Sequence, residues 1–244
     1  MSGLFAAHRA VPIPMLRALA AVGLAMSLVA CSQTTNFGAA QITSVKPPQY
    51  AALSDATYSI PEVAAEAIDP AFVKQRVRYV TAHPPGTIVV DPGAKFLYLV
   101  MEGGYAMRYG IGVGREGFGW SGSADIRRKA EWPTWTPPAA MIARQPELES
   151  YRRGMKPGIE NPLGARALYL FQNGKDTLYR IHGTNEPESI GKNVSSGCVR
   201  LLNQDVIDLF NRTPVGAKVI VLPERTRSRR ADESAQRDAT PLRN

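Results

Sequence analysis

The chain has 244 residues, which is enough for one ordinary domain with appendages. Because 44% of the residues are hydrophobic and only 20% are charged, the chain can bury a core and does not have the composition of a disordered protein. Arginines in the first 30 residues and in the tail after Leu222 supply part of the net charge of +8. What remains is a mildly basic domain, which suits an acidic substrate or a membrane surface. No Lys- and Arg-rich run with interleaved aromatic residues is present, so nucleic acid is not an expected partner.

The first 30 residues have the pattern of an export signal rather than of a folded element. A basic front is followed by the uncharged run ALAAVGLAMSLVA (18–30), which is too short to span a bilayer, because a spanning helix needs about 20 apolar residues. The run ends in LVAC, which resembles the lipobox of bacterial lipoproteins. That resemblance implies lipidation of Cys31, a periplasmic location and, with Ser32 next, anchoring to the outer membrane. The alternative is a buried N-terminal helix that ends in a cysteine.

The segments on either side of the main domain carry little pattern. Residues 31–85 are expected to form a lipid-anchored spacer, with a short helix near Pro70 to Arg76 indicated by PEVAAEAIDPAFVKQRVRYV. The polar, arginine-rich residues 223–244 are expected to form a disordered tail. The predicted organisation is therefore a signal peptide over 1–30, the spacer, a folded domain over 86–222 and the tail.

Between residues 86 and 222, short β-rich runs alternate with Gly and Pro. TIVVD and FLYLVM flank a tight turn, YAMRYGIGVG follows, and a second hairpin joins ALYLF to TLYRIHG through Asn173-Gly174. LNQDVIDLFNR is the clearest helix, with Asn203 placed to cap it and Asp205 in its first turn, and TPVGAKVIVL predicts a turn and a last strand. The predicted fold is mainly β, a β-sandwich or partly closed barrel of mixed sheets with one or two short helices.

Gly112, Gly114 and Gly117 fit the G-x-G-x-x-G fingerprint of dinucleotide-binding proteins. The residues that follow, FGWSGSAD, do not open a helix, and no βαβ unit surrounds them, so a pyrophosphate would lack a helix N-terminus. We interpret these glycines as places where a strand bends and a loop begins.

His182 and Cys198 lie 16 positions apart in the polar stretch HGTNEPESIGKNVSSGCVRL. If Cys31 is acylated, Cys198 is a lone thiol in an exported protein, and such a thiol needs a function to justify it. A histidine within reach can take the thiol proton and later return it to a leaving amine. The small-residue turn at 195–197 directly precedes the cysteine, and consecutive amides in such a turn can stabilise the oxyanion of an acyl-transfer intermediate.

The same two residues are also compatible with a buried structural cysteine and a surface histidine. A zinc site is disfavoured, because His8 and His83 are far away in sequence and neither C-x-x-C nor H-E-x-x-H occurs. No metal and no cofactor is expected.

The motif HGT, followed after a short loop by S-x-G-C-x-R-L, resembles the signature of the L,D-transpeptidase catalytic domain (YkuD-type). The similarity covers roughly 86–222 and includes GTIVVD, NPLGARALYL and IHGTNEPESIG. It implies that Cys198 is the nucleophile and His182 the base. It also implies that the carbonyl of Gly183 orients the histidine ring and that Arg200 supports the active-site loop and substrate acids.

The oxyanion and substrate contacts implied for this site come from Ser195, Ser196, Gly197, Arg200 and Trp135. Many family members carry a histidine directly before the Gly-Cys pair, where this chain has Ser196. Serine can donate a hydrogen bond but cannot carry a proton near pH 7. Trp132 and Trp135 are placed to wall a substrate groove or, equally well, to belong to the core.

The family's reaction is the attack of a cysteine thiolate on the L-centred carbonyl of diaminopimelate in a peptidoglycan tetrapeptide stem. D-Alanine leaves, and the acyl group passes to an amine. The resemblance leaves the acceptor open: another stem peptide, which gives a 3–3 cross-link, an outer-membrane protein, or a free amino acid.

Two other functions stay as alternatives. A Cys–His peptidase of the cell wall is disfavoured, because the peptidases suited to comparison place cysteine before histidine in the chain. A non-catalytic peptidoglycan-binding lipoprotein that tethers the membrane to the wall is disfavoured by the intact pair of Cys198 and His182.

Overall fold

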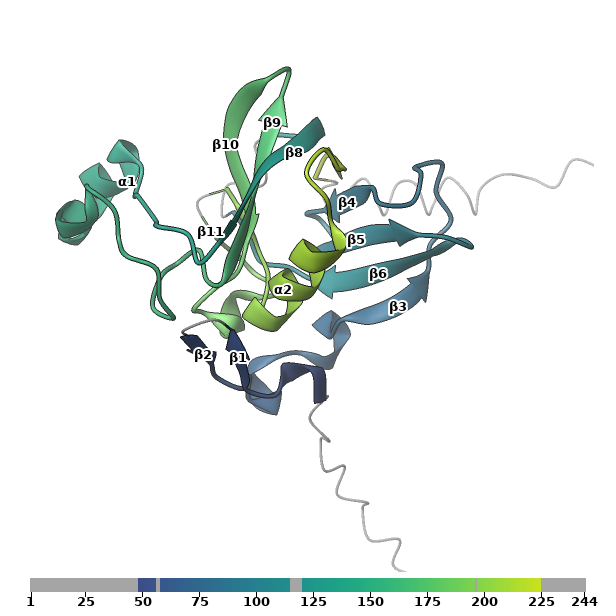
Figure 1. Ribbon diagram of the computed structural model, residues 1–244, viewed down its shortest axis with the longest axis horizontal. Coiled ribbons are helices and arrows are strands. Elements are labelled where there is room, and N and C mark those ends of the chain that lie inside the picture. The colour runs from purple at the N-terminus through teal and green to yellow at the C-terminus, as the bar shows by residue number, and fades with distance from the viewer. Residues whose placement is uncertain (1–47, 56–57, 115–119, 196, 225–244) are drawn as a thin grey trace, which may run out of the picture. The chain divides into compact units, whose positions relative to one another are not determined.

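The computed structural model describes residues 48–55, 58–114, 120–195 and 197–224, and within them one mixed sheet of nine strands dominates (Figure 1). The strands of this sheet are β3 (Gln75–Arg78), β4 (Ile88–Asp91), β5 (Phe96–Met101), β6 (Tyr105–Gly110), β8 (Gly122–Glu131), β9 (Arg166–Gln172), β10 (Lys175–His182), β12 (Val199–Arg200) and β13 (Lys218–Val221). Their spatial order is β12-β10-β9-β8-β13-β4-β5-β6-β3.

Smaller elements complete the described part of the chain. Two short sheets pair β1 (Leu53–Asp55) with β2 (Tyr58–Ile60) and β7 (Val113–Gly114) with β11 (Asn193–Ser195). The α-helices are α1 (Ala139–Arg144) and α2 (Asn203–Arg212), and the 3-10 helices are η1 (Pro48–Tyr50), η2 (Ala65–Ala67), η3 (Pro70–Phe72), η4 (Pro146–Tyr151) and η5 (Pro187–Ser189).

The predicted hairpins are confirmed. β4 pairs with β5 and β5 with β6, both antiparallel, and β9 pairs with β10 across the Asn173-Gly174 turn. Both turn residues have positive φ, 51° for Asn173 and 77° for Gly174, which is the backbone that a two-residue hairpin turn requires. The last strand, β13, runs parallel to β4 and antiparallel to β8, so the sheet is mixed.

The sheet curls until its two ends approach each other. Gly112, just beyond β6, forms two backbone hydrogen bonds with Arg200 of the edge strand β12, at 3.0 and 2.9 Å. These bonds join opposite regions of one sheet without closing it fully, because β3 still extends past β6. The prediction of a mainly β fold with a partly closed barrel of mixed strands is therefore confirmed.

One hydrophobic core fills the curl, and α2 packs into it between the β8–β10 and β4–β6 arms (Figure 1). The helix contributes Val206, Leu209 and Phe210 to this core. Its position was predicted, and Asp205 does lie in the first turn, but the predicted cap was wrong: Leu202 is the N-cap residue and makes no side-chain capping bond. Asn203 is instead the first helical residue, and its side chain bonds to neighbouring loops.

The strand β8 was not predicted. Its sequence, GSADIRRKAE, is rich in charge, and only Ala124 and Ile126 are fully buried. The strand forms because it lies between β13 and β9 and satisfies its backbone groups on both sides. Tertiary pairing outweighs the polar composition here.

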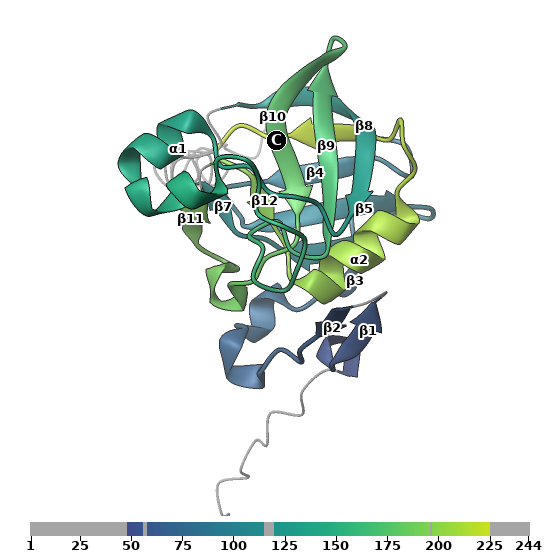
Figure 2. The ribbon, with the colours of Figure 1, turned by 60° about the vertical axis from the view of Figure 1, so that its left-hand side comes forward.

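The segment expected to be a spacer over 31–85 is, from residue 48 onward, part of the folded unit (Figure 2). The edge strand β3 pairs with β6 over four residues, and Tyr50 and Ile60 are each only 1% exposed. The helix predicted near Pro70 to Arg76 is also wrong. Only the 3-10 helix η3 forms there, and the chain then extends at Val73 into β3.

A buried polar cluster attaches this N-terminal segment to α2. The Tyr50 hydroxyl donates to the Asp205 carboxylate at 3.1 Å and accepts from the Lys74 backbone N–H at 2.8 Å. The Lys74 ammonium lies 3.8 Å from Asp205 and 3.5 Å from Asp208. Burial, with the charge of Asp208 adding to it, raises the pKa of Asp205 to about 7, although Lys74 and Tyr50 oppose that rise.

Candidate active site

Two adjacent parallel strands bring His182 and Cys198 together. Ile181 pairs with Val199 and His182 with Arg200, so extending the register by one residue places Cys198 beside Arg180. Ile181 and Val199 are fully buried in the core, and successive side chains along a strand alternate between faces. The residues on the opposite face are therefore Arg180 and His182 on one strand and Cys198 and Arg200 on the other.

The imidazole of His182 is fixed by the next residue in the chain. His182 is only 3% exposed, and its Nδ1 lies 2.6 Å from the carbonyl oxygen of Gly183. A carbonyl oxygen can only accept a hydrogen bond, so Nδ1 carries the hydrogen and Nε2 is left as the basic nitrogen. This contact is the one that the family resemblance implied for Gly183.

Asn203 holds the loop that contains this carbonyl, a role that sequence reasoning missed. Its side-chain oxygen accepts from the backbone N–H of Ala165 at 2.9 Å, and its nitrogen donates to the carbonyl of Thr184 at 3.0 Å. A side chain at Gly183 or at Gly164 would collide with the Asn203 oxygen, at 2.2 Å in each case. The sequence pointed to this loop only in part, since the segments NPLGA and HGT, which contain Gly164 and Gly183, both resemble the family.

Both members of the pair are uncharged in the resting protein. Burial lowers the pKa of His182 to about 4, with the positive charges of Arg200 and Arg180 adding to the effect, while the bond to Gly183 opposes it. Burial also raises the pKa of the Cys198 thiol, which the backbone of Arg180 and the two arginine charges offset only in part. These shifts favour a neutral thiol and a neutral imidazole at this site near pH 7.

The turn before Cys198 requires glycine at one position. Gly197 has φ of 122°, and a Cβ there would lie 3.3 Å from the ring of Tyr179. Ser195 ends β11, which pairs with β7. Ser196 and Cys31 lie outside the described residues, so their predicted roles stay predictions.

Each arginine at the site is paired with a carboxylate. The Arg200 guanidinium donates to Glu186 at 2.6 Å, and the Arg180 guanidinium makes two bonds to Asp176, at 2.6 and 2.8 Å. Both arginines thus stay close to the thiol with their charge largely balanced. A substrate carboxylate would have to compete with Glu186 for Arg200.

The two tryptophans considered for the groove wall differ in position. Trp132 is buried, packs against Tyr58 with ring centroids 4.1 Å apart and planes tilted by 35°, and donates to Asp55 at 2.9 Å, so it belongs to the packing of the N-terminal hairpin. Trp135 is half-buried, and its backbone forms two hydrogen bonds with Met155. Its role in substrate binding stays a prediction.

Two further features bear on the sequence predictions. Gly112 forms backbone hydrogen bonds with Arg200, and Gly114 lies in β7, which pairs with β11. These two glycines of the dinucleotide-like motif therefore take part in strand pairing, and Gly117 lies outside the described residues.

Among the residues that the structure describes, no three His, Cys, Asp or Glu side chains gather to hold a metal ion. None of the helices in the described ranges is long and apolar enough to cross a membrane.

His182 and Asp205 are expected to give opposite pH dependences of stability over one pH range. His182 resists protonation in the folded protein, so its contribution is present above pH 6.5 and is lost as the pH falls towards 4. Asp205 favours protonation, so its contribution is present below pH 4 and is lost as the pH rises towards 7. Each effect is on the order of 3 kcal/mol, and in the wild type the two offset each other.

Urea denaturation between pH 7 and pH 4 separates the two groups. As the pH falls from 7 to 4, the free energy of unfolding of His182→Gln should rise relative to the wild type, because only the contribution of Asp205 remains. That of Asp205→Asn should fall relative to the wild type, because only the contribution of His182 remains. Parallel curves for all three proteins would show that neither group titrates abnormally.

Comparisons with known proteins show the family to which this sequence belongs. The family model for the L,D-transpeptidase catalytic domain (YkuD) matches residues 85–221. A putative L,D-transpeptidase of Fuscovulum blasticum is 40% identical over 101 residues, which is 41% of this chain and 49% of that protein. The probable L,D-transpeptidase YbiS of Escherichia coli K12 is 40% identical over 125 residues, 47% of this chain and 37% of that protein. The matches thus span half or less of these two relatives.

A solved structure from Brucella melitensis, described as a probable carnitine operon oxidoreductase, is 50% identical and covers 64% of this chain and 97% of that chain, with a TM-score of 0.45.

Proposed function

Because the chain belongs to the L,D-transpeptidase catalytic domain family, we propose that it is a cysteine-dependent peptidoglycan L,D-transpeptidase. The observation that carries the proposal is the pairing of β10 with β12. This pairing places Cys198 two residues along the strand from the position opposite His182, on the same face of the sheet, and the tautomer of His182 is fixed by Gly183. A base with an available Nε2 on the same face of the sheet as a thiol suits the proton transfers of acyl transfer.

In the first half-reaction, His182 Nε2 takes the Cys198 proton as the sulfur attacks the carbonyl carbon of the third stem residue. A C–S bond forms, and the carbonyl oxygen becomes an oxyanion next to the turn at Ser195, Ser196 and Gly197, whose backbone N–H groups are the proposed donors. The C–N bond to D-alanine then breaks, and the imidazolium returns its proton to the leaving amine.

In the second half-reaction, an acceptor amine attacks the thioester. His182 takes a proton from the attacking nitrogen, the C–S bond breaks, and the proton passes to the thiolate. Both residues return to the neutral state that their pKa shifts favour at pH 7. A neutral imidazole suits this step, because an imidazolium could not accept the proton of the amine.

Arg200 is proposed to hold the loop and to meet acidic groups of the substrate. Its backbone bonds to Gly112, and its guanidinium is already in contact with Glu186, so it is rigid before substrate arrives. Peptidoglycan stem peptides carry carboxylates, which suits the basic character of the domain. Trp135 is proposed as a wall of the peptide groove.

The cellular setting proposed for this enzyme is the periplasm. Residues 1–30 are proposed to be a signal peptide that directs lipidation of Cys31 and anchoring to the outer membrane. Because residues from 48 onward are folded, the spacer between the lipid and the domain is shorter than the sequence predicted. The acceptor is proposed to be a second stem peptide or an outer-membrane protein.

Mass spectrometry of the products formed from a disaccharide-tetrapeptide tests the reaction. Residues 32–244 retain every described element, and Cys198→Ala is the control. Loss of D-alanine with formation of a dimer, absent in the variant, would establish transfer to a second stem. Binding to intact sacculi without any turnover would instead favour the non-catalytic tethering lipoprotein.

A further inference from the structure

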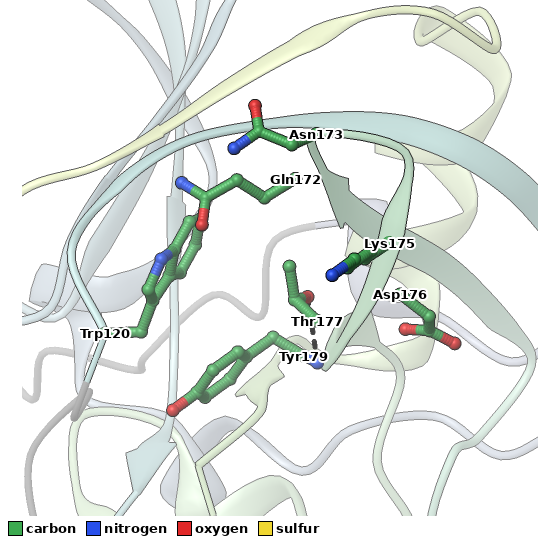
Figure 3. Close-up of a pocket in the computed structure, with 7 residues that line it drawn as sticks. All are labelled: Trp120, Gln172, Asn173, Lys175, Asp176, Thr177 and Tyr179. Carbon is green, nitrogen blue, oxygen red and sulfur yellow. Dashed lines mark hydrogen bonds between the residues drawn. The ribbon is translucent and has the colours of Figure 1, made fainter.

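A hollow of about 370 Å³ lies beside the candidate active site, and the proposed proton transfers do not use it (Figure 3). One wall is aromatic and consists of Trp120 and Tyr179. The other wall is the β9–β10 hairpin, which contributes mostly polar side chains.

The two aromatic side chains of this wall contact each other. The rings of Trp120 and Tyr179 are stacked, with centroids 5.7 Å apart and planes 22° from parallel. Trp120 packs in addition against the main core, which limits its freedom to turn away. Two large, nearly parallel rings at the edge of a solvent-facing hollow offer a flat apolar platform to a ligand.

A register irregularity in β10 positions Tyr179 of the aromatic wall. The pairing of β10 with β9 shifts between Asp176 and Arg180, and Leu178 has φ of 63° and is 76% exposed. The Asp176 carboxylate accepts from the Leu178 N–H at 2.8 Å, and the Thr177 hydroxyl donates to the Leu170 carbonyl at 2.6 Å. A strained bulge held by two side chains is typical of a site where a strand re-aims a residue for function.

The same residues touch the candidate nucleophile. The carbonyl of Leu178 lies 4.0 Å from Cys198 Sγ, and the Tyr179 ring packs against Gly197. The bulge therefore forms one side of the thiol site and one side of the hollow.

The polar wall suits hydroxyl and amide groups. Gln172 donates to the Ser123 carbonyl at 3.1 Å, which leaves its amide oxygen to accept. The Asn173 amide lies at the rim, and Figure 3 shows the Lys175 ammonium extending into the hollow. Lys175 forms no ion pair with any other residue that the structure describes, whereas Asp176 is already bonded to Arg180.

We propose that this hollow binds the amino sugar to which the donor's stem peptide is attached, an assignment that rests on the proposed function. The apolar face of the pyranose ring lies on Trp120 and Tyr179. The hydroxyl and N-acetyl groups bond to Gln172, Asn173 and Lys175.

The distances fit this ligand. Lys175 lies five positions before Arg180, which is beside the thiol, and a strand rises about 3.3 Å per residue, so the far end of the hollow lies roughly 16 Å along β10 from the residue beside Cys198. The stem between the attacked carbonyl and the sugar is about three residues long and spans roughly 10 Å when extended. A stem that starts at the thiol therefore delivers its sugar to the aromatic wall.

Kinetics with two donors tests the proposal: the disaccharide-tetrapeptide and the free tetrapeptide. The wild type should have the lower KM for the glycosylated donor, and Trp120→Ala should raise that KM about tenfold, with the free tetrapeptide unaffected. Trp120→Phe should keep most of the preference. Tyr105→Ala, which removes an aromatic side chain on β6, is the matched control and should change neither KM.

A binding measurement separates this proposal from the proposed reaction. The disaccharide without peptide is titrated into Cys198→Ala and into Cys198→Ala/Trp120→Ala, which removes any dependence on turnover. Binding that the second change weakens supports the sugar site, even if no donor is turned over. Equal KM values for both donors in the wild type would overturn the proposal. An equal rise in KM for both donors in Trp120→Ala would also overturn it, because the hollow would then hold peptide rather than sugar.

Discussion

We expect His182→Gln to lower the rate of D-alanine release from a tetrapeptide donor by about 10²- to 10⁴-fold at pH 7, the usual contribution of a general base. Burial raises the pKa of the Cys198 thiol, so without the imidazole almost no thiolate forms at neutral pH. The loss should shrink as the pH rises above 9, because hydroxide then ionises the thiol without a base. Mass spectrometry of released D-alanine at a series of pH values measures both effects.

The matched control for this variant is His83→Gln. His83 precedes β4 and is distant in sequence from the thiol, so its replacement should leave the rate and its pH dependence unchanged. A loss smaller than tenfold for His182→Gln at pH 7, or the same fractional loss at pH 7 and pH 10, would show that His182 is not the base.

The second large effect concerns stability. Asp55→Ala should lower the free energy of unfolding by about 3 kcal/mol, because it removes one partner of a buried ion pair. Arg166 is 4% exposed and makes two bonds to Asp55, at 2.6 and 2.9 Å, and Trp132 donates to the same carboxylate. The Arg166 Nε already lacks a hydrogen-bond partner, so in the variant this buried guanidinium keeps only the Ala165 carbonyl at 2.9 Å and the Glu131 carboxylate at 3.8 Å.

Urea denaturation measures this loss. Asp125→Ala is the control, because Asp125 pairs with Lys218 and Arg127 near the surface and its removal should cost much less. Adding Arg166→Met to Asp55→Ala should recover part of the stability, since it removes the unpaired charge. A change in Asp55→Ala no larger than in the control would mean that β1 contributes little to the folded unit.

Sequence reasoning was most successful where the determinants are local. The Asn173-Gly174 turn and the tight turn between TIVVD and FLYLVM predict hairpins, because turn geometry depends only on near neighbours. The candidate site could be named for a similar reason. HGT and SGC are short motifs on two segments, and the fold brings the segments together as adjacent parallel strands.

Contacts between residues distant in sequence account for what was missed. Asn203 had the character of a cap, yet its partners Ala165 and Thr184 are 38 and 19 positions away. Tyr50 gave no sign of folding, because its bond to Asp205 spans 155 positions. The polar strand β8 is likewise held by neighbours that its own sequence does not reveal.

The pKa shifts were also beyond sequence reasoning, which expected a histidine that stabilises a thiolate. Both shifts come chiefly from burial, which only the packed structure displays. Ordinary alkylation of the thiol across pH is therefore a poor test of activity, because a neutral thiol with a raised pKa reacts slowly whether or not it is catalytic.

The central claim is that Cys198 forms a thioester with the stem peptide, and mass spectrometry of the intact protein tests it most directly. The folded chain is mixed with tetrapeptide donor and quenched in acid within seconds. The account predicts added mass equal to the tripeptide acyl group, located on Cys198 by peptide mapping, removed by hydroxylamine and absent from Cys198→Ala. D-Alanine release without any adduct on Cys198, or an adduct that persists in the variant, would contradict the account.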